Sequence, residues 1–261
     1  MGFAGAGERR IGRAGEDVDG RPAYRRTRID THHWRLHMSA TLPEGLLLVA
    51  VDAERRFACP AGGDALSYGL AGAVVTELLL QGAVRVTERG QLIAGHPTGD
   101  QLLDDVLLGI RASRPRPVTS WVRVLAGRPV NLHQRLAGRL VRAGVLRQQR
   151  RRLLGVLPVR RYAVADEAVL EELRARLRAG LLGHGALDPR TASLIGLVGA
   201  CGLVDGLVDR DERRAAGRRA ATIGAADPAG AAVSAAIRDA RAAVAAGATA
   251  AVVASTTPTS G

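Results

Sequence analysis

The sequence predicts a mainly α protein with a compact helical-bundle core, short peripheral strands and one protruding β-hairpin flanked by basic residues. The 261 residues are 47% hydrophobic but only 3% aromatic, so Leu, Val, Ile and Ala must build the core. That composition favours packed helices over an aromatic-rich β-sandwich. Apolar residues recur at helical spacing over most of the chain, whereas alternating patterns are short and flank tight turns.

The first half of the central region is predicted to contain three helical segments and two strands. A dense apolar run over 43–51 fits a short helix or a buried strand, and a helix follows over about 66–81. Residues 84–92 predict two short strands around a tight turn. The sequence Pro97-Thr98-Gly99-Asp100 then begins a helix that Pro115 and Pro117 end. The apolar stripe of that helix comprises Leu102, Leu103, Val106, Leu107 and Ile110.

The second half is predicted to contain two short helices, a hairpin and two longer helices. The short helices span about 120–126 and 132–143, and the hairpin follows with its tip at 155–158. Asp166 is a suitable N-cap for an amphipathic helix. Asp188-Pro189 then starts an apolar helix expected to cover 194–207.

These elements are expected to form one domain over 41–250. Residues 1–40 lack a sustained hydrophobic period and are predicted to be a disordered leader, with order beginning after Met38, which fits an alternative start codon. Residues 251–261 are expected to be a flexible tail. The longest apolar run is shorter than the roughly 20 residues that span a bilayer. The two cysteines, Cys59 and Cys201, are too few for a disulfide scaffold and are expected to be buried free thiols.

Positive charge is concentrated in one stretch of the chain. The net charge is +12 and the pI about 11.3, and arginine supplies all 37 basic residues. Between residues 106 and 165 there is no Asp or Glu but there are 14 Arg, so the rest of the chain sums to −2. Such a stretch indicates a polyanionic partner, either nucleic acid or an acidic membrane surface.

One interpretation of this stretch is a membrane-binding surface. Arginines at helical spacing and an apolar hairpin tip with a basic collar are what a shallowly inserted element requires, because guanidinium groups pair with lipid phosphates. The same tip also fits a core contact or a contact between copies of the chain. The predicted lipid-binding residues are Arg128, His133, Arg135, Arg139 and Arg142, and the predicted inserting residues are Leu153, Leu154, Val156 and Leu157.

A second interpretation is a winged-helix DNA-binding regulator. Residues 132–143 would be its recognition helix and 147–164 its wing, with Asn131 and Gln134 as the candidates for reading bases. A third is an adaptor whose arginine face meets an acidic protein. No phosphate loop, zinc motif or nucleophile elbow is recognisable, so no enzyme, metal or cofactor is predicted. The paired carboxylates Asp104-Asp105 are expected on a solvated face or at a helix cap.

An ordered set of segments resembles the Golgi phosphoprotein 3 family of peripheral membrane proteins. The segments are Leu42-Pro43-Glu44-Gly45, Ser67-Tyr68-Gly69-Leu70, Pro97-Thr98-Gly99-Asp100, Gly144-Val145-Leu146 and Asp188-Pro189-Arg190-Thr191, and the resemblance covers roughly residues 40–250. It implies a helical bundle with a hydrophobic hairpin and a non-enzymatic membrane adaptor. It also implies binding to phosphatidylinositol 4-phosphate on the cytosolic face of Golgi membranes.

The residues that form the headgroup pocket of that family differ here. Gly62 stands at the position of a Trp and Ala71 at that of an Arg, while Val130 and His133 align with two further Arg. The resemblance therefore implies attraction to acidic lipid in general more than a grip on one phosphomonoester. The absence of Lys, together with abundant Ala and Gly, favours a bacterial relative, of actinobacterial type, in which the protein is cytoplasmic and peripherally membrane-associated.

Overall fold

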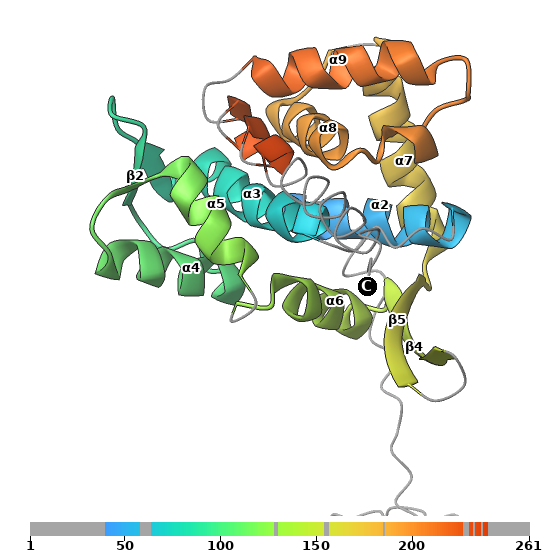
Figure 1. Ribbon diagram of the computed structural model, residues 1–261, viewed down its shortest axis with the longest axis horizontal. Helices are drawn as coiled ribbons and strands as arrows, with labels where there is room; N and C mark the ends of the chain where they lie inside the picture. Colours follow the sequence, from blue (N-terminus) through green and yellow to red (C-terminus); the bar gives the residue numbers. More distant parts are fainter. Residues whose placement is uncertain are drawn as a thin grey trace, which may run out of the picture.

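The computed structural model is a bundle of helices with a β-hairpin projecting from one edge (Figure 1). The structure describes residues 40–57, 64–127, 130–153, 157–184, 186–226, 230–231, 233–235 and 237–239. In the view of Figure 1, α8 and α9 form the top, α2 and α3 cross the middle, and α4, α6 and the hairpin lie along the lower edge. The mainly α prediction is confirmed.

The centre of the bundle is helix α2 (Leu42–Phe57), which contacts α3, α6, α7, α8 and strand β5. Every residue from 42 to 51 is buried, so the apolar run carries no amphipathic period. This explains why the sequence alone left a helix and a strand equally open for this segment. Its neighbour α3 (Asp64–Leu80) is also buried along most of its length and carries the fully buried carboxylate of Glu77.

A small antiparallel sheet and two helices form the left part of the molecule in Figure 1. The sheet comprises β1 (Val84–Val86), β2 (Gln91–Ala94) and β3 (Arg116–Pro117), and the helices are α4 (Gln101–Ala112) and α5 (Val118–Ala126). Asp100 caps α4 by accepting hydrogen bonds from the N–H groups of Leu102 and Leu103. The five residues predicted for the buried stripe of α4 are all buried, which confirms that prediction.

Helix α6 (Leu132–Arg142) leads directly into the projecting hairpin. Gly144 adopts a left-handed conformation, with φ of 75°, which ends the helix and turns the chain into β4 (Leu146–Leu153). The partner strand β5 (Leu157–Val164) pairs antiparallel, from Leu146 opposite Val164 at the buried base to Leu153 opposite Leu157 at the outer end. The predicted hairpin is confirmed, and residues 154–156 at its tip lie outside the described part.

Three helices and a 3₁₀ turn complete the bundle. They are α7 (Glu167–Leu182), capped by Asp166 as predicted, α8 (Pro189–Cys201), the 3₁₀ turn Val204–Gly206 and α9 (Arg213–Ala225). The apolar helix predicted for 194–207 ends early, because Gly202 adopts a left-handed cap with φ of 72°. Helices α8 and α9 approach closely at Gly196 and Gly224, where a Cβ on Gly196 would lie 2.8 Å from the Gly224 Cα.

Several expectations concern residues outside the described part of the chain. The leader 1–39, the tail 251–261 and Cys59 belong to this group. Cys201 is only partly buried, in contrast to the expected buried thiol. Among the described helices, none combines the length and apolar character that crossing a bilayer requires.

Candidate functional site

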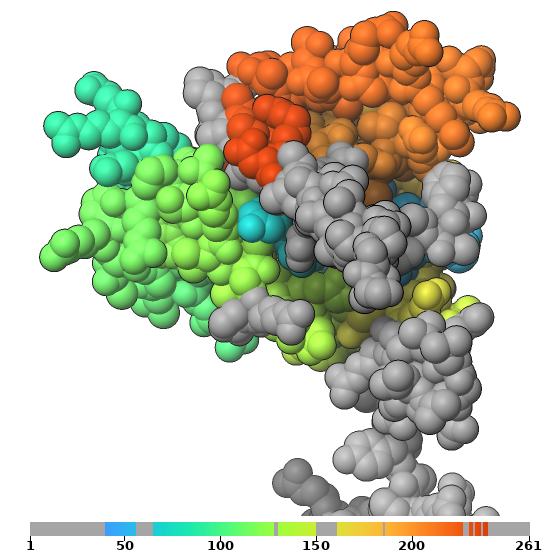
Figure 2. Space-filling model, viewed as in Figure 1, coloured from blue at the N-terminus to red at the C-terminus, as the bar shows by residue number. Residues whose placement is uncertain are grey.

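Three of the predicted lipid-binding arginines line one concave surface on α6. Arg135, Arg139 and Arg142 face the first residues of α4 and the Glu44 side chain across a cavity of about 760 Å³. We call this surface the basic cleft, defined by those three arginines with Glu44, Gly99, Asp100, Gln101, Leu102 and Ala143. In the space-filling view, α4, α5 and α6 form a continuous surface along the left and lower side of the molecule (Figure 2).

Arg139 is the structural centre of the basic cleft. Its Nε lies 3.1 Å from Glu44 Oε1 and its Nη2 lies 2.7 Å from Asp100 Oδ2. Burial alone would raise the pKa of Asp100, but hydrogen bonds from Arg139 and from the backbone of α4 outweigh it and lower that pKa. The ion pairs tie the first turns of α2 and α4 to α6, and they already occupy much of the positive charge of Arg139.

The other two arginines of the cleft differ in their partners. Arg135 is paired with Asp105 of α4. Arg142 is exposed, and its Nε donates a hydrogen bond to the Gly138 carbonyl at 3.3 Å. Within the described residues no carboxylate lies at ion-pair distance from Arg142, so its charge is available to a ligand. Asp104 accepts hydrogen bonds from the Thr98 N–H and hydroxyl and from the Gly99 N–H, in the turn before α4. This agrees with the capping role expected for the Asp104-Asp105 pair.

His133 lies on α6 at the base of the hairpin. Its ring centroid is 5.7 Å from that of Tyr162 on β5. Burial lowers the pKa of His133 below its usual 6.5. The imidazole is therefore neutral at pH 7 and supplies no positive charge to the surface. Arg128, the remaining predicted headgroup ligand, lies outside the described residues.

The strand register of the hairpin places basic residues opposite one another. In the backbone ladder Arg150 is opposite Arg160 and Gln149 is opposite Arg161, and the ladder ends three positions beyond Arg150 at the Leu153–Leu157 pair. Of the predicted inserting residues, Leu153 and Leu157 are thus cross-strand neighbours, and Leu154 and Val156 lie outside the described part.

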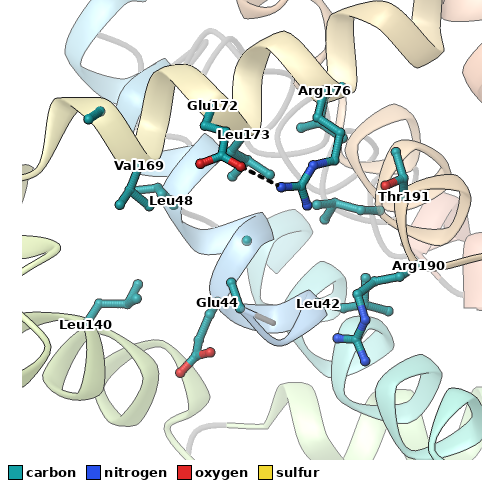
Figure 3. Close-up of a pocket in the computed structure, with 15 residues that line it drawn as sticks. Leu42, Glu44, Leu48, Leu140, Val169, Glu172, Leu173, Arg176, Arg190 and Thr191 are labelled. Atoms are coloured by element: carbon teal, nitrogen blue, oxygen red, sulfur yellow. Dashed lines mark hydrogen bonds and ion pairs between the residues drawn. The ribbon is translucent and has the colours of Figure 1, made fainter. Parts of the chain in front are cut away.

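A second, apolar cavity lies beside the basic cleft, and sequence analysis did not anticipate it. It measures about 290 Å³ and lies between α2, α6, α7 and α8 (Figure 3). We call it the apolar cavity, and its walls include Leu42, Leu48, Leu140, Leu173, Leu177 and Leu194. Because four helices supply these leucines, no local sequence pattern could have revealed it.

Charged side chains surround the apolar cavity but are paired within the protein. Arg190 donates two hydrogen bonds of 2.8 Å to the Glu77 carboxylate, and Arg176 pairs with Glu172 at 3.2 Å. Glu44 lines both cavities, and Figure 3 shows its carboxylate pointing away from Leu48 and Leu173. Glu44 therefore marks the boundary between the two cavities.

Two of the positions that the resemblance aligns with the family's headgroup pocket lie in or against the core. Ala71 is fully buried in α3, and Val130 is partly buried against the core. Gly62 lies outside the described residues.

Comparison with known proteins agrees with this architecture. The sequence profile of Golgi phosphoprotein 3 (GPP34) matches residues 42–240. The chain is 27% identical over 139 residues to vacuolar protein sorting-associated protein 74 of Eremothecium gossypii, covering 45% of this chain and 42% of that protein. It is 25% identical over 159 residues to the protein of the same name from Schizosaccharomyces pombe, covering 52% and 47%. The matched segments thus span less than half the length of these relatives, but the profile extends over most of this chain, which belongs to the Golgi phosphoprotein 3 family.

Proposed function

We propose that this protein is a non-enzymatic peripheral membrane protein that binds acidic phospholipid surfaces through α6 and the β4–β5 hairpin. The observation that carries the proposal is the position of two elements from the stretch 106–165, which contains no Asp or Glu. Helix α6 and the hairpin follow one another along one edge of the molecule, and the hairpin extends beyond the bundle (Figure 1). A flat anionic surface can approach this edge and meet both elements at once.

Electrostatic attraction supplies the first part of the binding energy in this proposal. Arg142 and Arg147 are exposed, and neither has a carboxylate at ion-pair distance within the described part of the chain. Near an anionic membrane each such residue contributes about 1 kcal/mol. Leu153, Leu154, Val156 and Leu157 would supply the second part by entering the boundary between headgroups and acyl chains.

Selective recognition of phosphatidylinositol 4-phosphate is not part of the proposal. Members of the family are associated with that lipid, but the residues at its headgroup positions here are Gly62, Ala71, Val130 and His133. None of them carries a charge at pH 7, since burial lowers the pKa of His133. We therefore propose general binding to acidic lipid. A bacterial origin, in which the target would be the cytoplasmic membrane, and a role as an adaptor for protein cargo extend the same hypothesis.

The geometry of α6 argues against the DNA-binding alternative. A recognition helix must present a free face to the major groove, which is about 12 Å wide. Two arginines of α6 are instead held in ion pairs, Arg135 by Asp105 and Arg139 by Asp100, so they are not free to reach into a groove.

Vesicle co-sedimentation of the full-length chain tests the proposal. Neutral vesicles, generic anionic vesicles and vesicles containing phosphatidylinositol 4-phosphate are compared at matched total charge and physiological salt. We expect equal binding to both anionic preparations, weak binding to neutral vesicles, and release as salt is raised. Failure to sediment with any of the vesicles would overturn the proposal, and saturable preference for one DNA duplex over random DNA would then support the DNA-binding alternative.

A further inference from the structure

Two adjacent cavities of opposite character suggest a ligand with two different ends. The basic cleft is polar and carries three arginines, whereas the apolar cavity is walled by leucines, and the two meet at Glu44. We infer that together they bind a single-chain anionic amphiphile, with its aliphatic chain in the apolar cavity and its phosphate in the basic cleft. The position of the phosphate rests on the proposed function, which assigns anion binding to the arginines of α6.

The apolar cavity suits one aliphatic chain. Leu42, Leu140 and Leu177 are at most 1% exposed, so the walls are fixed parts of the core. A volume of about 290 Å³ lies just below the usual range of small-molecule sites, roughly 300–1,000 Å³, and leaves no room for the two chains of a diacyl lipid. Apolar cavities of this kind do not hold water well and accept apolar ligands.

The carboxylates next to the chain would not oppose its entry. Glu44 Oε2 accepts hydrogen bonds from the Thr41 N–H and hydroxyl, and Oε1 is paired with Arg139. Glu172, the other carboxylate that lines the cavity, is paired with Arg176 at 3.2 Å. Neither carboxylate is left as an unpaired charge beside the cavity, and an unpaired charge would be costly to desolvate further.

The charges at the two rims decide where the anionic head lies. On the α7 and α8 side Arg176 is paired with Glu172 and Arg190 with Glu77, so both arginines there are held by carboxylates. On the α6 side Arg142 has no carboxylate partner within the described residues, and Arg135 is half-exposed. The basic cleft is therefore the rim that attracts a phosphate.

Calorimetric titration with ethyl, butyl, hexyl and octyl phosphate, each below its micelle concentration, tests this inference without any bilayer. Burying each added methylene should raise the affinity about four-fold until the cavity is full, after which the affinity levels off. Affinity that does not change with chain length would overturn the inference. If vesicles bind while alkyl phosphates do not, the inference fails and the proposed function stands.

Two pairs of variants locate the ligand. Val169→Trp, which fills the mouth of the apolar cavity from α7, should abolish the chain-length dependence, and Val124→Trp, on the exposed face of α5, should retain it. Arg142→Gln should weaken binding about two- to ten-fold at every chain length, and Arg176→Gln should not. Equal effects within either pair, or a larger effect of Arg176→Gln, would contradict the two-cavity site.

Discussion

Arg190 of α8 forms a two-pronged ion pair with Glu77 of α3, with two nitrogen–oxygen distances of 2.8 Å. The Glu77 side chain is fully buried, and it also accepts hydrogen bonds of 2.7 Å from the Leu42 N–H and from Gln81. One carboxylate thus fixes the start of α2 and the start of α8 against α3. The first turn of α2 carries Glu44, so both cavities depend on this arrangement.

Glu77→Gln should destabilise the fold by about 2–4 kcal/mol, because the variant breaks a charge pair whose acidic member is buried. Urea unfolding at pH 7 measures this loss. Glu172→Gln is the matched control, since its pair with Arg176 is exposed and should change stability by less than about 0.5 kcal/mol. Equal midpoints for the two variants would show that the Glu77 network is not structural.

Asp105→Asn should strengthen binding to anionic vesicles by roughly two- to five-fold, because it releases Arg135 from its carboxylate partner. Vesicle titration followed by sedimentation measures the change. Asp205→Asn is the control, because it alters the net charge equally but releases Arg213, far along the chain from α6. Asp205 lies in the 3₁₀ turn and Arg213 in α9. If both variants gain the same affinity, net charge and not the basic cleft governs binding.

His133 should affect stability at low pH and not lipid binding at neutral pH. Its folded-state pKa is lowered by burial, so the unfolded chain takes up the proton first and stability falls as the pH drops below 6.5 towards the folded value. The difference in unfolding free energy between pH 7.5 and pH 5.5 should therefore be smaller in His133→Gln.

Vesicle binding by His133→Gln at pH 7.5 should match that of the unaltered chain. A marked loss there would mean that the imidazole contacts lipid directly or is charged at neutral pH.

Local periodicity predicted the elements that have one buried and one exposed face. The stripe of α4, the cap Asp166 and the β4–β5 hairpin all follow from nearest-neighbour rules. The same rules could not decide between helix and strand for the start of α2, because that segment is buried on all sides. They also extended α8 too far, because a single glycine at 202 within an apolar run does not mark a helix end clearly in the sequence.

The pairing of the arginines lay beyond sequence reasoning for a different reason. The stretch from 106 to 165 contains no carboxylate, which suggested that its arginines are all free. The structure brings Glu44, Asp100 and Asp105 to α6 from earlier parts of the chain, and these occupy Arg139 and Arg135. Charge density along the sequence therefore overstated how much of the positive charge on α6 a ligand can use.

Hairpin insertion is the central claim, and sedimentation of the double variant Leu154→Asp, Leu157→Asp with anionic vesicles tests it most directly. The control is Leu80→Asp, Val86→Asp, which places the same charges on exposed apolar positions at the end of α3 and on β1. Both variants should unfold at the same denaturant concentration as the unaltered chain. The account predicts that only the hairpin variant leaves the vesicles, and binding that persists unchanged in that variant would contradict insertion.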